Sequence, residues 1–218
     1  MMKLTCVVAV LTAAAGTPLH SQLPTCSDTT EYVWLDGKDT IAVERVYIGA
    51  AAFHSRMNAL SQKAHLVYFG QLGADGLVTE MTVNVWQPGA DTARIPSQVA
   101  SVRFAPTAVS SLVASPAGRV QAQQDSVSAG TMPFMTGVLV FLELAYRRAR
   151  TAGLDSIPML WLFTGGHREA AKVQSWALDS IRITMPQDTF RLYSPSRAGP
   201  ATLRATSGGT ALRQCKAF

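Results

Sequence analysis

The stretch Thr131-Met132-Pro133-Phe134-Met135-Thr136-Gly137, continuing into residues 138–153, decides the fold of this chain. Its apolar residues recur at helical spacing, whereas the segments before and after it read as strands and turns. We expect a helix over residues 136–152, with Thr136 as its N-terminal cap and Gly153 as its left-handed stop. One side of this helix carries an apolar stripe, and Glu143 with the arginines of the last turn lies on the other side. The stripe consists of Val138, Phe141, Leu142, Ala145 and Ala149.

Such a stripe needs a broad apolar surface to lie on. Burial stabilises the folded chain by roughly 1.5 to 3 kcal/mol for each large apolar side chain, so the helix will not stand alone. In a chain otherwise made of strands, the surface that receives it is a sheet. We therefore expect a mainly β protein with one long helix, in which an antiparallel curved sheet, a half-barrel, holds the helix in its concave face. A closed sandwich is the alternative.

About ten strand candidates surround the helix. In residues 77–86, Met81, Val83 and Val85 alternate with polar residues, which is typical of a strand with one buried face. Residues 157–163 carry apolar side chains on both parities and need cover on both sides. Within residues 41–48 the apolar residues change parity, and this predicts a bulge near Glu44 and Arg45.

The N-terminus indicates export. Lys3 is followed by an apolar run over residues 4–15 and by small residues up to Gly16, the order found in a secretory signal peptide. A membrane anchor is the competing interpretation, but a spanning helix needs about 20 apolar residues. We assign residues 1–21 to the signal peptide, and we expect the protein to be periplasmic or secreted, with no transmembrane span after cleavage.

The remaining chain divides into a domain and a tail. Residues 22–193 are expected to form a single β half-barrel domain, and residues 194–218, rich in Pro, Gly, Ser and Arg, a loosely packed C-terminal tail. Cys6 lies in the signal peptide, which leaves Cys26 and Cys215 near the two ends of the exported chain. In an oxidising compartment this pair predicts a disulfide that joins the termini, and two unpaired thiols are the alternative.

The charge pattern argues against a nucleic-acid partner. The net charge is +5, and the basic residues form no run beyond Arg147 and Arg148. No catalytic motif and no cofactor motif is found, because the chain has no Gly-x-Ser-x-Gly elbow, phosphate-binding loop or metal-ligand spacing. His54 and His65 fall on neighbouring strands without further donors for a metal, and His167 with Glu169 suits a turn. No catalytic residue, metal or cofactor is predicted.

Three segments carry a resemblance to a known type of protein: residues 39–45, the hairpin 73–76 with the strand 78–85 after it, and Met132-Pro133-Phe134 ahead of the helix. In layout the chain resembles exported bacterial proteins with the open, curved sheet of the periplasmic lipoprotein carriers (LolA/LolB type) and lipid-binding half-barrels. The resemblance covers most of residues 39–193. It implies an acyl chain held between the concave sheet and the helix, and it assigns no individual residue.

Large apolar side chains are the candidate ligand-binding residues, because methionine and aromatic side chains suit adaptable apolar sites. They either line a cavity between helix and sheet or fill the core. The first hypothesis is a non-enzymatic exported protein that binds or carries a lipid-like or other apolar ligand in the cell envelope. The alternatives are a structural or protein-interaction module of the envelope with a filled core, and a hydrolase of undetermined type. The candidates are Phe53, Met57, Trp86, Phe134, Phe141, Met159 and Trp161.

Overall fold

The computed structural model describes residues 29–36, 38–60, 62–87, 95–164, 167–177, 180–186, 189–193, 201–205 and 210–216. The predicted signal peptide and Cys26 lie outside these residues, so the signal peptide and the Cys26–Cys215 disulfide stay predictions. In chain order the elements are β1 (Thr29–Asp36), β2 (Asp39–Ile48), β3 (Ala52–Ala59), β4 (Ala64–Leu72), β5 (Val78–Trp86), β6 (Gln98–Ala105), β7 (Ala108–Ala114), β8 (Val120–Ser126), β9 (Met132–Phe134), α1 (Val140–Ala152), β10 (Ser156–Trp161), β11 (Arg168–Ala177), β12 (Ser180–Thr184), β13 (Thr189–Tyr193), β14 (Ala201–Ala205) and β15 (Thr210–Lys216).

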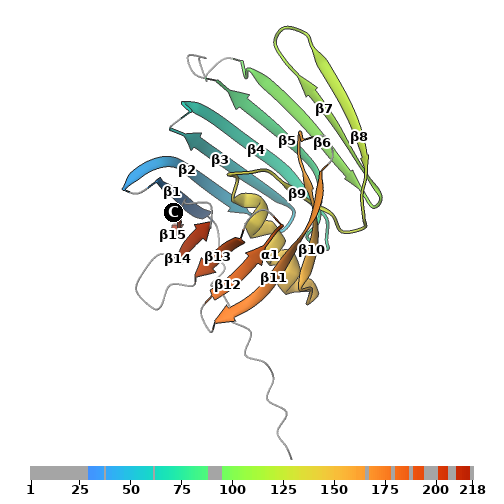
Figure 1. Ribbon diagram of the computed structural model, residues 1–218. Helices are drawn as coiled ribbons and strands as arrows, with labels where there is room; N and C mark the ends of the chain where they lie inside the picture. The colour runs from blue at the N-terminus through green and yellow to red at the C-terminus, as the bar shows by residue number, and fades with distance from the viewer. Residues whose placement is uncertain are drawn as a thin grey trace, which may run out of the picture.

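The fifteen strands of the described residues belong to one sheet, in the order β8-β7-β6-β5-β4-β3-β2-β1-β15-β14-β13-β12-β11-β10-β9. The chain runs outward from β1 to β8, crosses through β9 and α1, and returns from β10 to β15, which pairs with β1. The sheet curves around α1 and leaves β8 and β9 as its two edges (Figure 1). The expectation of a mainly β, open, curved sheet with one helix in its concave face is therefore confirmed.

Three strands were missed by the sequence analysis. β9 runs parallel to β10, whereas residues 132–134 were expected to be a lead into the helix. β14 pairs with β13, and β15 pairs with both β14 and β1, so the expectation of loosely packed chain is wrong for residues 201–205 and 210–216. The physical reason is that β15 completes the hydrogen bonding of β1, a partner at the opposite end of the chain that local composition does not reveal.

The helix begins at Val140, four residues later than expected, and Thr136 is exposed and caps nothing. Residues 140–146 are at most 4% exposed on every side of the helix, so the buried surface is wider than the predicted stripe. Glu143, expected to face solvent, is among them. Gly153 ends the helix in the left-handed conformation as expected, with φ 65° and its N–H donated to the carbonyl of Ala149. No helix in the described ranges is long and apolar enough to cross a membrane.

The bulge expected near Glu44 and Arg45 is not at that position. β2 pairs with β3 in continuous register from Ala42 to Ile48, and alternate side chains of β2 point inward, including Glu44. The register shift lies three residues earlier in β2: Trp34 and Leu35 of β1 pair with Ala42 and Thr40, so Ile41 is the extra residue of β2. The parity argument failed because it assumed that a carboxylate would not take an interior position, whereas Glu44 finds buried hydrogen-bond donors there.

Gly70 is required by the packing of Phe53, its direct partner across β3 and β4. A Cβ at residue 70 would overlap the ring of Phe53, which is 1% exposed. We expect Gly70→Ala to lower the free energy of unfolding by about 1 to 3 kcal/mol, the usual cost of overpacking a core. Urea denaturation measures this. Gly49→Ala is the control, since its Cβ meets only the end of the exposed Tyr47 side chain, and it should change stability by less than about 0.5 kcal/mol.

Candidate ligand-binding site

Most of the predicted ligand-binding residues fill the space between helix and sheet. The ring of Phe141 packs edge-on against Phe53 and Tyr68, at centroid distances of 6.4 and 5.7 Å. Phe134 packs edge-on against Trp161 at 4.7 Å. These are contacts of a packed core, in which the described side chains beneath the helix are buried against one another. The predicted residues in this core are Phe53, Met57, Phe134, Phe141 and Met159, with Trp161 partly buried at its border.

Trp86 lies apart from the other candidates. Val83 and Val85 point toward the concave side of β5, so Trp86, one residue further, points to the outer face. There it contacts the imidazole of His65 at a centroid distance of 5.4 Å. The structure therefore does not bring Trp86 together with the other six candidates.

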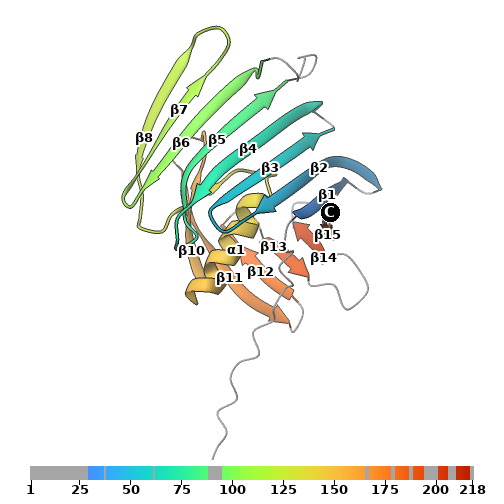
Figure 2. The same ribbon diagram turned by 180° about the vertical axis from the view of Figure 1, so that it is seen from behind.

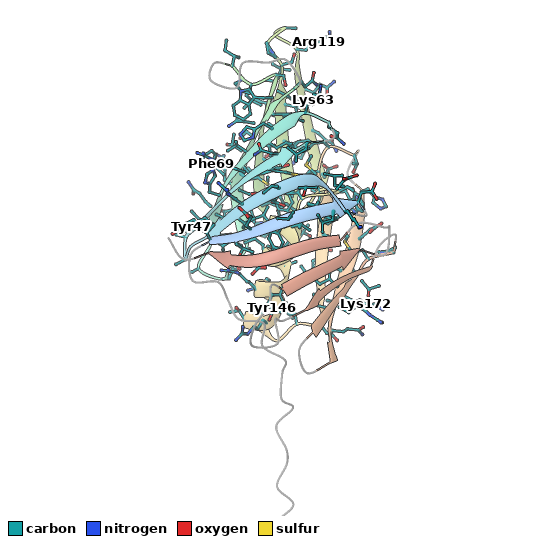
Figure 3. All side chains as sticks on the ribbon, turned by 90° about the vertical axis from the view of Figure 1, so that its left-hand side faces the viewer. Tyr47, Lys63, Phe69, Arg119, Tyr146 and Lys172 are labelled. Atoms are coloured by element: carbon teal, nitrogen blue, oxygen red, sulfur yellow. The ribbon has the colours of Figure 1, made fainter. Side chains whose placement is uncertain are left out.

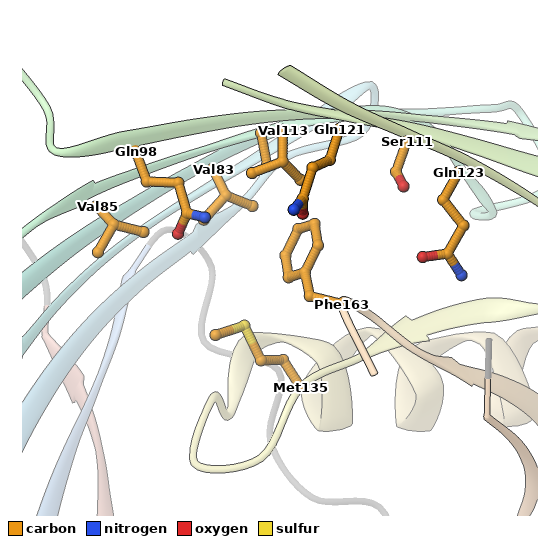
Figure 4. A pocket seen from close by; sticks show the side chains of 10 residues that line it. Val83, Val85, Gln98, Ser111, Val113, Gln121, Gln123, Met135 and Phe163 are labelled. Carbon is orange, nitrogen blue, oxygen red and sulfur yellow. The ribbon is translucent and has the colours of Figure 1, made fainter. Parts of the chain in front are cut away.

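A cavity lies beside the helix. Strands β5 to β8 extend past α1 in both views (Figures 1 and 2), and their concave face is left uncovered by the helix there. A cavity of about 340 Å³ occupies this place, with Met135 and Phe163 on the side opposite the strands (Figure 4). Its lining is Val83, Val85, Gln98, Ala100, Ser111, Val113, Gln121, Gln123, Met135 and Phe163.

The cavity combines an apolar floor with neutral polar groups. β5, β6 and β7 contribute valines and an alanine, and Met135 and Phe163 add apolar surface from the other side. Side-chain amides and one hydroxyl come from β6, β7 and β8. Among the described residues that line the cavity, none carries a charge. Such a surface suits a molecule that is mostly apolar and has a few hydrogen-bonding groups.

Phe163 has two unusual properties for a phenylalanine. Its backbone adopts φ 62°, in the left-handed region that bulky residues rarely enter, and its side chain is 42% exposed. In Figure 4 its ring reaches toward Val113 and Gln121 across the cavity. Strained backbone conformations cluster at ligand-contacting sites, so Phe163 is the residue of the cavity that most clearly suggests a function.

Sequence reasoning missed every residue of this cavity. It selected aromatic and methionine side chains by type, and the structure places nearly all of them in the core. The signal that was present is the alternation in β8, where Gln121 and Gln123 occupy positions that would be apolar in a strand facing a filled core.

A buried carboxylate forms the N-terminal cap of α1. Glu44 is completely buried, and its Oε2 accepts the backbone N–H of Leu139 at 2.7 Å. Its Oε1 accepts the hydroxyl of Ser55 at 2.7 Å and the N–H of Val140 at 3.2 Å. Burial raises the pKa of Glu44 to about 7, although the three donors act in the opposite direction. Burial, with the nearby Glu44 carboxylate, also raises the pKa of Tyr68.

A second buried carboxylate holds the next turn of the helix. The hydroxyl of Tyr32 donates to Glu143 Oε2 at 2.7 Å, and Arg147 Nε lies 3.2 Å from Glu143 Oε1. Arg147 also donates to the backbone carbonyl of Ile48 at 3.4 Å. Because Glu44 and Glu143 are enclosed by protein and bound to protein donors, we interpret both as anchors that fix the helix in the sheet and not as groups that meet a ligand.

The histidines of β3 and β4 contact neighbouring side chains. His54 and His65 lie on the outer face, where His54 stacks on Phe69 at 4.4 Å and His65 lies 2.6 Å from the amide oxygen of Asn58. Figure 3 shows Phe69 and Tyr47 projecting from this face. Burial and the charge of Arg56 lower the pKa values of His54 and His65. Within the described residues, no three His, Cys, Asp or Glu side chains are grouped so that they could hold a metal.

Comparison with known proteins adds little to this geometry. No protein-family model matches the chain, and no curated protein sequence matches it significantly. Among solved structures, the chain is similar to a DUF1089 family protein from Pseudomonas aeruginosa, with 13% identity, 79% of this chain and 88% of that chain covered, and a TM-score of 0.43.

Proposed function

We propose that this protein binds or carries a lipid-like or other apolar ligand in the cell envelope, and that the ligand occupies the cavity between β5–β8 and the pair Met135 and Phe163. The cavity is the observation that carries the proposal. Its volume of about 340 Å³ falls within the roughly 300 to 1,000 Å³ of small-molecule sites, and its floor is apolar. The assignment to the envelope rests on the signal peptide expected at residues 1–21.

The position of the cavity fits such a role. The sheet is open between its edge strands β8 and β9, and β8, Met135 and Phe163 border the cavity at this opening. A ligand can therefore enter sideways, without displacing α1 from its buried anchors. In this proposal the packed core keeps the scaffold rigid, and the uncovered part of the sheet holds the ligand.

The second candidate function is a structural or protein-interaction module of the envelope. The filled core between helix and sheet favours it, since the residues expected to line a cavity are buried against one another. Uptake of apolar molecules by the cavity beside the helix would favour the ligand-binding function over the interaction module.

Filling the cavity tests the proposal. Val113 points into it from β7, and Leu112, one residue before, points to the outer face and is 48% exposed. We expect Val113→Trp to weaken binding of the fluorescent apolar probe N-phenyl-1-naphthylamine by at least about tenfold, because the indole takes the volume of the ligand. Leu112→Trp is the matched control and should bind the probe like the unchanged protein.

Two results would contradict the proposal. One is equal probe binding by the two tryptophan variants when both show the circular dichroism spectrum and thermal melting of the folded protein. The other is absence of any bound lipid in native mass spectra of protein purified from its own envelope without detergent. Either result would favour the interaction module.

A further inference from the structure

The cavity wall also indicates which kind of head group the ligand has. We propose that the site takes an amphiphile with an uncharged head that donates hydrogen bonds and a hydrocarbon chain short enough for a cavity of about 340 Å³. In this proposal Gln123 receives the head, and Asp125 orients Gln123. This inference rests on the proposed function and specifies its ligand.

The first argument is the orientation of the Gln123 amide. Its Nε2 donates to Oδ1 and Oδ2 of Asp125 at 3.0 and 2.8 Å. Since the carboxylate has only acceptors, the nitrogen of this amide must face Asp125 and the oxygen must face away from it. In Figure 4 the oxygen of Gln123 lies on the side of Phe163. Gln123 therefore offers the cavity an acceptor, and a ligand group that satisfies it must be a donor.

The second argument is the pairing geometry of β8, which keeps both residues on one face. Gln123 lies opposite Ser111, and Asp125 lies opposite Val109, on alternate positions of the same strand pair. Asp125 is thus fixed beside the cavity without lining it. Its negative charge disfavours an anionic head at this end of the cavity.

The third argument is the absence of a counter-charge in the lining. Transfer of an ion into a partly enclosed apolar site is costly unless an opposite charge or several donors compensate it. The described lining has amides and a hydroxyl but no basic side chain. Arg103, the basic residue of β6, points to the outer face and lies 3.7 Å from Glu80. A carboxylate or phosphate head would find no partner in this wall.

The test uses ligands that share a hydrocarbon chain and differ in the head. Monocaprin has an uncharged head with two hydroxyl donors, methyl caprate an uncharged head without donors, caprate an anionic head and decylamine a cationic head. Their affinities are measured by isothermal titration calorimetry below the concentrations at which they form micelles. We expect monocaprin to bind about tenfold more tightly than methyl caprate, caprate and decylamine. Decylamine gains little from Asp125, because Asp125 does not line the cavity and both of its carboxylate oxygens accept from Gln123.

Two variants on β8 and one control test whether Gln123 and Asp125 cause the preference for the head group. Gln123→Leu should weaken monocaprin binding by about tenfold and leave methyl caprate binding unchanged, because methyl caprate has no donor for the lost amide oxygen. Asp125→Asn should reduce the difference in affinity between monocaprin and caprate. The negative charge that repels caprate is lost, and the Gln123 amide is free to turn its NH₂ group toward the ligand. Gln124→Leu, on the outer face of the same strand, should change none of the affinities. Thermal melting confirms that each variant is folded.

The outcomes separate this inference from the proposed function. Caprate or decylamine binding as tightly as monocaprin would overturn the inference about the head and leave the apolar site intact. Equal losses in Gln123→Leu and Gln124→Leu would overturn the role of Gln123. If none of the four ligands binds and Val113→Trp does not alter probe binding, the proposed function fails, and the inference fails with it.

Discussion

At pH 8, where Glu44 is ionised, replacing it by glutamine is expected to lower the free energy of unfolding by roughly 2 to 4 kcal/mol. The carboxylate accepts three hydrogen bonds in a site closed to water, from Leu139, Val140 and Ser55. A glutamine has one acceptor oxygen, and its NH₂ group would face at least one of these donors. Each buried donor left without a partner costs about 1 to 3 kcal/mol, and the favourable interaction of a negative charge with the helix N-terminus is lost as well.

The measurement is urea denaturation followed by circular dichroism, with a surface glutamate as the control. Glu80 is on β5, and its Oε2 lies 3.7 Å from Arg103 in an exposed ion pair. Glu80→Gln should change stability by less than about 1 kcal/mol, because exposed pairs contribute little. A Glu44→Gln variant as stable as Glu80→Gln would show that Glu44 does not hold the helix, and the anchor interpretation would be wrong.

The existence of the helix and the class of the fold could be predicted because both depend on local periodicity. Phe141, Leu142 and Ala145 recur at helical spacing, and Met81 and Val83 at strand spacing. Both patterns are properties of adjacent residues, and the packing of one against the other follows from the need to bury apolar surface. This reasoning was therefore sufficient to predict a curved sheet around a single helix.

The helix cap and the closing strands could not be predicted, because their partners are distant in the chain. Glu44 and the amide of Leu139 are 95 residues apart, and β15 pairs with β1 at the other end of the sequence. A glutamate followed by an arginine in a strand, as in Glu44-Arg45, is locally a solvent-facing residue. The interior position of Glu44 becomes favourable because the N-terminus of α1 packs there and donates hydrogen bonds to the carboxylate.

The candidate site was missed for a different reason. Core and ligand site use the same apolar residue types, and composition alone does not distinguish Phe141, which is fully buried, from Phe163, which is half-exposed. What separates them is which part of the sheet the helix covers. The glutamines of β8 become informative once that is known.

A dependence of stability on pH is also expected from Glu44. Its pKa is raised from 4.5 to about 7 in the folded protein, because burial disfavours the charged form. Below pH 4.5, the pKa of Glu44 in the unfolded chain, the carboxyl group is protonated in both states and does not lower the free energy of unfolding. Between about pH 4.5 and 7 the unfolded chain releases the proton while the folded chain keeps it, so the free energy of unfolding falls as the pH rises. Above about pH 7 the free energy of unfolding has fallen by the full amount that corresponds to this pKa shift, about 3 kcal/mol.

The other groups that titrate in this range require a differential measurement. His54 and His65 have lowered pKa values, so their contribution has the opposite sign: stability is lost as the pH falls. Both lie on the outer face and stay unchanged in Glu44→Gln. The difference in unfolding free energy between the unchanged protein and this variant, followed by urea denaturation from pH 4.5 to 8, therefore isolates Glu44. It should decrease by about 3 kcal/mol across that range, and a constant difference would mean that the carboxyl group ionises at its ordinary pKa despite its burial.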